Sequence, residues 1–158
     1  MLPRDEDLPE VVRQLLRVGL TKFAGCLKGG MGAWVAASLP VQGLAQLPVR
    51  ELNKLLPPRD FQLLDVRTPH EWDEGHLPGA RYLFLGDLPQ KLRALSPDKP
   101  VVIYCASGYR SSLAASLLQA NGFHKVQNVP GSYSAWTAAE FPVVKPADTS
   151  RKASDTQR

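Results

Sequence analysis

An apolar run, a cysteine, a tight turn and an alanine-leucine stretch follow one another in the second half of the chain. The run Val101–Tyr104 is short and β-branched and follows a proline, which predicts a buried strand. Leucines recur at helical spacing in the stretch Leu113–Ala120. Cys105 is therefore predicted to lie at the carboxyl end of a strand, and a Ser-Gly turn then leads to the N-terminus of a helix.

The predicted surroundings of Cys105 favour a reactive thiolate. Backbone N–H groups and the positive end of the helix dipole would point at the sulfur. Such sites lower a thiol pKa from about 8.5 to between about 3.5 and 7.5. A cysteine in an apolar strand is otherwise most often a core residue. Gly108, which lets the backbone curl around a bound anion, and Arg110, which neutralises it, favour the reactive interpretation.

Length and composition exclude several classes of protein. The 158 residues suffice for one domain and part of a second, and 44% apolar and 22% charged residues are typical of soluble globular chains. The net charge of +4 is mild and no basic run reaches five residues, which argues against nucleic-acid binding. Two cysteines form no disulfide framework, and a reducing cytoplasm suits a reactive thiol.

Neither a metal or cofactor site nor a targeting or membrane segment is predicted. The three histidines show no metal-ligand spacing. The N-terminus is acidic and polar, unlike the start of a signal peptide. Residues 29–47 carry no charge, but a proline, two glutamines and several glycines predict a helix and a turn there, not a membrane span.

An internal repeat organises the chain. Residues 15–41 align with residues 117–143 when one single-residue slip is allowed. Chance similarity between two amphipathic helices would explain matching leucines and alanines, but not other residues in register. A glycine, an Ala-Trp pair and a Pro-Val pair recur at an offset of 102: Gly29 with Gly131, Ala33-Trp34 with Ala135-Trp136, and Pro40-Val41 with Pro142-Val143. We therefore predict a duplicated unit of about 100 residues.

This repeat divides the chain unequally. Residues 1–41 are predicted to be the C-terminal remnant of a first, inactive copy, because no cysteine stands at the position equivalent to Cys105. Residues 42–145 form a complete copy, and residues 146–158 form a disordered polar tail. Cys26 is expected to be a packing residue. The missing strands of the first copy suggest that it docks on the complete domain or pairs between chains, as a possible dimer.

Strands and helices alternate in the complete copy. We predict strands at residues 61–66, 80–85, 101–104 and 125–129, a helical turn at 71–74, and helices at 49–56, 88–95, 110–121 and 132–139. This order predicts an α/β fold, with a central parallel sheet of about five strands and helices on both faces. Ligands bind such sheets at the carboxyl ends of the strands, where Cys105 is predicted to lie.

Three segments resemble the rhodanese family of sulfurtransferases, over about residues 45–145. They are Leu64–Arg67 with Glu71-Trp72 and Gly75–Ala80, the loop Cys105–Ser111, and Gly131–Trp136. The last segment has Ser132 where the family usually has a second glycine, a departure that we expect to be far from the sulfur and tolerated. Together, the remnant and the complete copy also resemble the C-terminal part of bacterial fusions of a metallo-β-lactamase-like persulfide dioxygenase with tandem rhodanese repeats.

The resemblance implies a rhodanese-like fold and sulfur transfer through a persulfide on Cys105. The donor would be thiosulfate or a persulfide, and the acceptor a thiol or cyanide. Related phosphatases have five residues between cysteine and arginine, whereas four separate Cys105 from Arg110 here. The shorter loop favours one sulfur atom over a tetrahedral phosphate. A phosphatase and a non-catalytic rhodanese-like interaction module are the alternatives.

The resemblance also assigns roles within the site. Cys105 is the nucleophile, and Arg110 guides the anionic donor. The intervening loop and the next residue would hold the persulfide or set access to it: Ala106, Ser107, Gly108, Tyr109 and Ser111. Asp65 and Arg67 would brace this loop, and Glu71 would pair with either Arg110 or Arg67.

Overall fold

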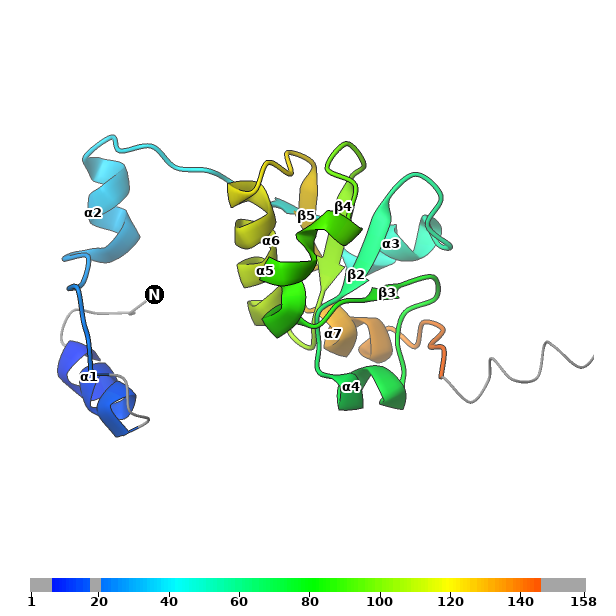
Figure 1. Cartoon of the computed structure of the whole chain (residues 1–158), viewed down its shortest axis with the longest axis horizontal. Coiled ribbons are helices and arrows are strands. Elements are labelled where there is room, and N and C mark those ends of the chain that lie inside the picture. Colours follow the sequence, from blue (N-terminus) through cyan, green and yellow to red (C-terminus); the bar gives the residue numbers. More distant parts are fainter. Residues whose placement is uncertain (1–6, 18–20, 146–158) are drawn as a thin grey trace, which may run out of the picture. The chain divides into compact units, whose positions relative to one another are not determined.

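Five short strands form one parallel sheet in the second part of the chain (Figure 1). The computed structural model describes residues 7–17 and 21–145, so the predicted tail 146–158 lies outside the described residues. The strands are adjacent in the order β1-β5-β4-β2-β3, and every pairing is parallel. Their bounds are Ala45–Gln46 (β1), Gln62–Asp65 (β2), Arg81–Tyr82 (β3), Val101–Tyr104 (β4) and Val126–Asn128 (β5).

The central strands are the apolar runs that the sequence singled out. Every residue of β2 and β4 is buried, as expected for strands covered on both faces. The predicted parallel sheet of about five strands is therefore confirmed. Strand β1 was not predicted, because Ala45 and Gln46 carry no strand signal and become a strand by pairing with β5.

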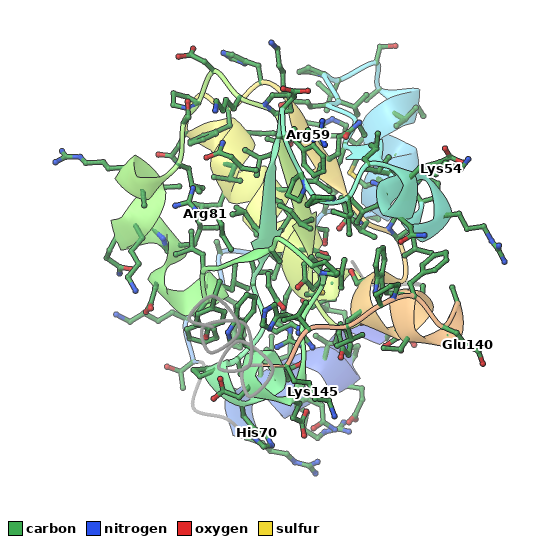
Figure 2. All side chains as sticks on the ribbon, turned by 90° about the vertical axis from the view of Figure 1, so that its right-hand side faces the viewer. Lys54, Arg59, His70, Arg81, Glu140 and Lys145 are labelled. Atoms are coloured by element: carbon green, nitrogen blue, oxygen red, sulfur yellow. The ribbon has the colours of Figure 1, made fainter. Side chains whose placement is uncertain are left out.

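Helices cover both faces of this sheet (Figure 1). One core cluster joins the sheet to α5 (Leu88–Lys91) and α6 (Tyr109–Ala120). The other joins it to α3 (Val49–Lys54) and α7 (Ser132–Ala138). Shorter elements complete the order, namely α4 (Pro69–Glu74), η2 (Leu85–Asp87) and η3 (Leu92–Ala94). Charged side chains such as Lys54 and Glu140 lie at the periphery (Figure 2).

The chain divides into two units, Met1–Gly43 and Leu44–Arg158. In the first, α1 (Leu8–Arg17) and α2 (Gly30–Ala36) contain no buried residue. The prediction that Cys26 is a packing residue was wrong, because its side chain is exposed. Exposed large apolar residues are numerous in this unit: Leu16, Phe23, Leu27, Met31, Val35, Leu39 and Val41. Its described residues include no strand that could cover them.

Candidate active site

Cys105 directly follows β4, and its side chain is accessible to solvent over only 1% of its surface. Its Sγ accepts a hydrogen bond from the backbone N–H of Gly108 at 3.1 Å and one from the hydroxyl of Ser111 at 3.5 Å. Gly108 has a φ of 113°, a backbone conformation that suits glycine, and α6 begins at the next residue. The strand, the turn and the helix therefore aim donors at the sulfur.

These donors determine the state of the thiol. Burial by itself would raise the pKa of Cys105. Hydrogen bonds from the side chain and backbone of Ser111 and from the backbone of Gly108 and Ser107 outweigh burial, so the pKa is lowered from its ordinary value. The direction is the one expected for a thiol at a helix N-terminus. The hydrogen bonds thus favour the thiolate form of Cys105 by more than burial disfavours it.

A second segment, at the start of α7, holds the backbone of Cys105. The N–H of Tyr133 donates to the carbonyl of Cys105 at 3.0 Å, and that of Ser134 donates to the carbonyl of Ala106 at 2.9 Å. The N–H of Cys105 donates to the hydroxyl oxygen of Ser132 at 3.2 Å. The expectation that Ser132 lies far from the site was wrong, since its side chain contacts the amide of the cysteine itself. Only its departure from the family's glycine marked it in the sequence.

Arg110 and Glu71 form a two-pronged ion pair. The guanidinium Nη1 and Nη2 donate to the two carboxylate oxygens of Glu71 at 2.7 and 2.6 Å. The hydrogen bond from Arg110 lowers the pKa of Glu71 to about 2, against burial and with help from Thr68. The ion pair with Glu71 raises the pKa of Arg110, and Cys105 adds to this. Of the two partners that the sequence left open for Glu71, the structure selects Arg110 over Arg67.

The ion pair connects the loop Cys105–Ser111, which contains Arg110, to α4. Thr68 caps this helix and donates to Glu71 from its N–H at 3.0 Å and from its hydroxyl at 2.7 Å. Glu71 in turn donates its own N–H to the Thr68 hydroxyl, which completes a capping box. Thr68 was not predicted as a site residue, although Thr-Pro-x-Glu is a sequence signal for this type of cap. Glu71 is thus held at a helix start before it meets Arg110.

Asp65 and Arg67 form a second, fully buried ion pair. The guanidinium Nη2 donates to Asp65 at 2.7 Å and to the carbonyl of Gly75 at 2.7 Å. The same guanidinium lies 3.9 Å from the centre of the Tyr133 ring. The N–H of Tyr133 donates to the carbonyl of Cys105, so the buried pair is linked to the loop Cys105–Ser111 through Tyr133. That the pair braces this loop stays a prediction.

The remaining loop residues are at least partly exposed to solvent. Ser107 and Tyr109 are exposed, and Tyr109 is accessible over 73% of its surface. Ala106 and Arg110 are half-buried. Cys105 itself is accessible over only 1% of its surface.

The described residues contain no group of three or more His, Cys, Asp or Glu side chains that could hold a metal ion. Within the same residues, no helix is both long enough and apolar enough to cross a bilayer.

The family model of the Rhodanese-like domain matches residues 48–139. The chain belongs to the rhodanese-like family. The match includes the loop Cys105–Ser111 and both ion pairs of the site, and it lies within the second unit of the chain. The fold and the family implied by the sequence are therefore confirmed.

Similar proteins extend this assignment. A protein named sulfurtransferase from Allochromatium vinosum is 37% identical over 94 residues, which cover 60% of this chain and 88% of that protein. The uncharacterized protein YqhL of Bacillus subtilis is 41% identical over 78 residues, or 49% of this chain and 62% of that protein. The crystal structure of a rhodanese-related protein from Thermoplasma volcanium has a TM-score of 0.58 at 27% identity, covering 63% of this chain and 97% of that one.

Proposed function

We propose that this rhodanese-like domain transfers sulfane sulfur from thiosulfate or a persulfide to a thiol or cyanide, through a persulfide on Cys105. One observation carries the proposal: the buried Cys105 Sγ lies within hydrogen-bond reach of the Gly108 N–H and the Ser111 hydroxyl. A relative named sulfurtransferase supports it. The reaction needs a reduced thiol, which a reducing compartment such as the cytoplasm maintains.

The first half-reaction loads the cysteine. The Cys105 thiolate attacks the outer sulfur of thiosulfate, a new S–S bond forms, and the old S–S bond breaks. Sulfite leaves with the electron pair of the broken bond. The terminal persulfide sulfur carries the negative charge. The N–H groups of Ser107, Gly108 and Ser111, which bind the Cys105 thiolate in the free protein, would stabilise that charge after loading.

The second half-reaction regenerates the thiolate. Cyanide or a thiolate attacks the terminal sulfur, and the bond to Cys105 Sγ breaks. Thiocyanate or a new persulfide leaves, and the electron pair returns to Cys105. No net oxidation or reduction of the enzyme occurs over the two steps, so no further reactant is needed.

The positive charge of Arg110 attracts an anionic sulfur donor. Its guanidinium is bound on one side by Glu71, whose carboxylate fixes its position and compensates part of its charge. The interaction of Arg110 with Cys105 keeps this charge next to the sulfur. A donor can therefore enter beside an arginine that is already oriented.

Thiocyanate formation from thiosulfate and cyanide tests the proposal. We expect turnover by the unmodified protein and a loss of roughly 10³-fold or more in Cys105→Ser, because the hydroxyl is a far weaker nucleophile than the thiolate. Cys26→Ser is the matched control, since this second cysteine is exposed and lies in the other unit. It should turn over at the unmodified rate.

Mass spectrometry identifies the intermediate. After incubation with thiosulfate, the peptide that contains Cys105 should gain the mass of one sulfur atom, and the peptide that contains Cys26 should not. Equal activity in the unmodified protein and Cys105→Ser would refute the proposal. Hydrolysis of a phosphate ester that is lost in the same variant, without sulfur loading, would favour a phosphatase. If the protein shows neither sulfur transfer nor phosphate-ester hydrolysis, the non-catalytic interaction module is the remaining alternative.

A further inference from the structure

Ser132 joins two strands of the sheet through one hydroxyl group. Its side chain is accessible over only 1% of its surface. The oxygen accepts a hydrogen bond from the N–H of Cys105, directly after β4, at 3.2 Å. The hydroxyl donates to the carbonyl of Val129, directly after β5, at 2.9 Å. The serine thus uses both its donor and its acceptor in holding the ends of two neighbouring strands together.

The backbone of Ser132 is unfavourable for a serine. Its φ is +50°, in the left-handed region that favours glycine. The repeat provides an internal comparison, because the equivalent residue at an offset of 102 is Gly30, with a φ of +58°. A side chain at Gly30 would meet no atom within 4 Å. The copy without a catalytic cysteine therefore makes the same turn with glycine, and the copy with the cysteine has serine.

We infer that Ser132 is a positioning residue for Cys105, whose hydroxyl holds the amide of the cysteine so that Sγ stays within reach of its donors. The inference rests on the proposed function. Glycine would adopt the left-handed backbone of this turn at a lower free-energy cost than serine. The two hydrogen bonds of the Ser132 hydroxyl offset that cost. Without them the N–H of Cys105, in a buried residue, would lose the partner it has in the structure.

The geometry at the sulfur is sensitive to this contact. The Ser111 hydroxyl lies 3.5 Å from Cys105 Sγ and 3.0 Å from the carbonyl of Gly108, so the two acceptors compete for its one hydrogen, while the N–H of Gly108 lies 3.1 Å from Sγ. Tyr133 binds the carbonyl side of Cys105, whereas Ser132 binds its N–H side. Removing the hydroxyl of Ser132 removes the hydrogen bond to the N–H of Cys105 and leaves the one to its carbonyl. A small shift of the strand end would then weaken the donors that stabilise the thiolate.

Ser132→Gly separates this role from a structural one. The variant removes the hydroxyl and relieves the left-handed backbone at the same time, so we expect a melting temperature equal to or above that of the unmodified protein. We expect turnover in the thiocyanate assay to fall about tenfold, with the loss in kcat. The second readout is the rate at which iodoacetamide alkylates Cys105 as a function of pH, followed on its own peptide.

The alkylation profile reports on the thiolate without any sulfur transfer. Loss of stabilising hydrogen bonds should shift its midpoint to higher pH by about half a unit to one unit. The charged groups on this side are Arg110 and its partner Glu71. Neither is changed by the substitution, so a shift would come from the position of Cys105 relative to its donors.

Two further variants complete the test. Ser132→Ala also lacks the hydroxyl but keeps a Cβ in the left-handed region, so it should lose activity as Ser132→Gly does and melt at a lower temperature. Glu140→Gly is the matched control for the backbone, because Glu140 is exposed and has a φ of +55°. It should melt no lower than the unmodified protein and leave turnover and alkylation unchanged.

The outcomes are distinguishable. Unmodified turnover and an unmodified alkylation profile in Ser132→Gly would overturn the inference. So would an activity loss that merely follows a lowered melting temperature. If the unmodified protein forms no persulfide and no thiocyanate, the proposed function fails. A shifted alkylation midpoint in Ser132→Gly would still support the placement of Cys105 by Ser132 in that case.

Discussion

Residues 29–41 and 131–143 have nearly the same local structure but different surroundings. The indole N–H of Trp34 donates to the carbonyl of Pro40 at 2.9 Å, and that of Trp136 donates to Pro142 at the same distance. Positive φ angles recur at three pairs of equivalent positions. The angle is 72° at Gly29 and 68° at Gly131, and it is 58° at Gly30 and 50° at Ser132. It is 55° at both Ser38 and Glu140. This agreement supports the predicted duplication.

The two copies differ in burial. Trp136 is fully buried in the core cluster that joins α7 to the sheet, whereas Trp34 is half-buried. Met31 and Leu39 are exposed, while their equivalents Tyr133 and Phe141 pack against that cluster. Short-range sequence therefore specifies the helix and its turns in both copies. Only the presence of a sheet turns the same helix into part of a core.

The largest expected effect is a contrast between the two tryptophans. Trp136→Ala should lower the free energy of unfolding of the second unit by about 3–5 kcal/mol, because it removes a fully buried aromatic side chain. Trp34→Ala should change it by less than about 0.5 kcal/mol, as expected for a substitution outside that unit. Urea denaturation followed by circular dichroism measures both. Equal denaturation midpoints in the two variants would contradict the claim that only Trp136 contributes to a core.

A smaller contrast concerns the ion pairs of the two units. The pKa of Glu71 is lowered from 4.5 to about 2 in the folded protein, mainly by Arg110. The unfolded chain binds more protons across this range, so the stability that the pair contributes is present above pH 4.5 and is lost as pH falls toward 2. We expect a loss of about 1–3 kcal/mol over this interval at this partly buried site.

Matched variants test the acid sensitivity. Glu71→Gln should flatten the dependence of the urea midpoint on pH between 4.5 and 2. Glu10→Gln removes the exposed ion pair with Arg13 in the first unit and should leave that dependence as it is, since exposed pairs contribute little. A pH dependence that persists in Glu71→Gln would show that other carboxylates dominate the acid response.

The smallest expected effect follows removal of the first unit. Deleting residues 1–43 should leave the unfolding free energy of the second unit within about 0.5 kcal/mol, because the second unit has its own sheet and core clusters. The exposed apolar residues of the first unit favour self-association, in line with the possible dimer through residues 1–41. Sedimentation should show fewer chains per particle after deletion, once the mass is divided by that of the shortened chain. An unchanged number of chains per particle would refute the prediction that the first unit causes self-association.

Predictions from the sequence succeeded where the signal was local. Strand β4, helix α6 and Cys105 between them follow from a β-branched run, a turn and leucine spacing. Strand β1 was missed because its two residues become a strand only beside β5. The prediction for Ser132 failed because its hydrogen bond to Cys105 spans 27 positions in the chain. No pattern of neighbouring residues reports such a contact.

The sequence by itself determined the family, the elements from α3 to α7 in their order, and the place of Cys105 between a strand and a helix, because each depends on residues close together in the chain. The tertiary structure decided which carboxylate meets which arginine and what holds the amide of Cys105. It also decided which of two equivalent helices is buried. These outcomes depend on groups brought together by parallel pairing of strands, since the crossovers between such strands place distant residues at one edge of the sheet.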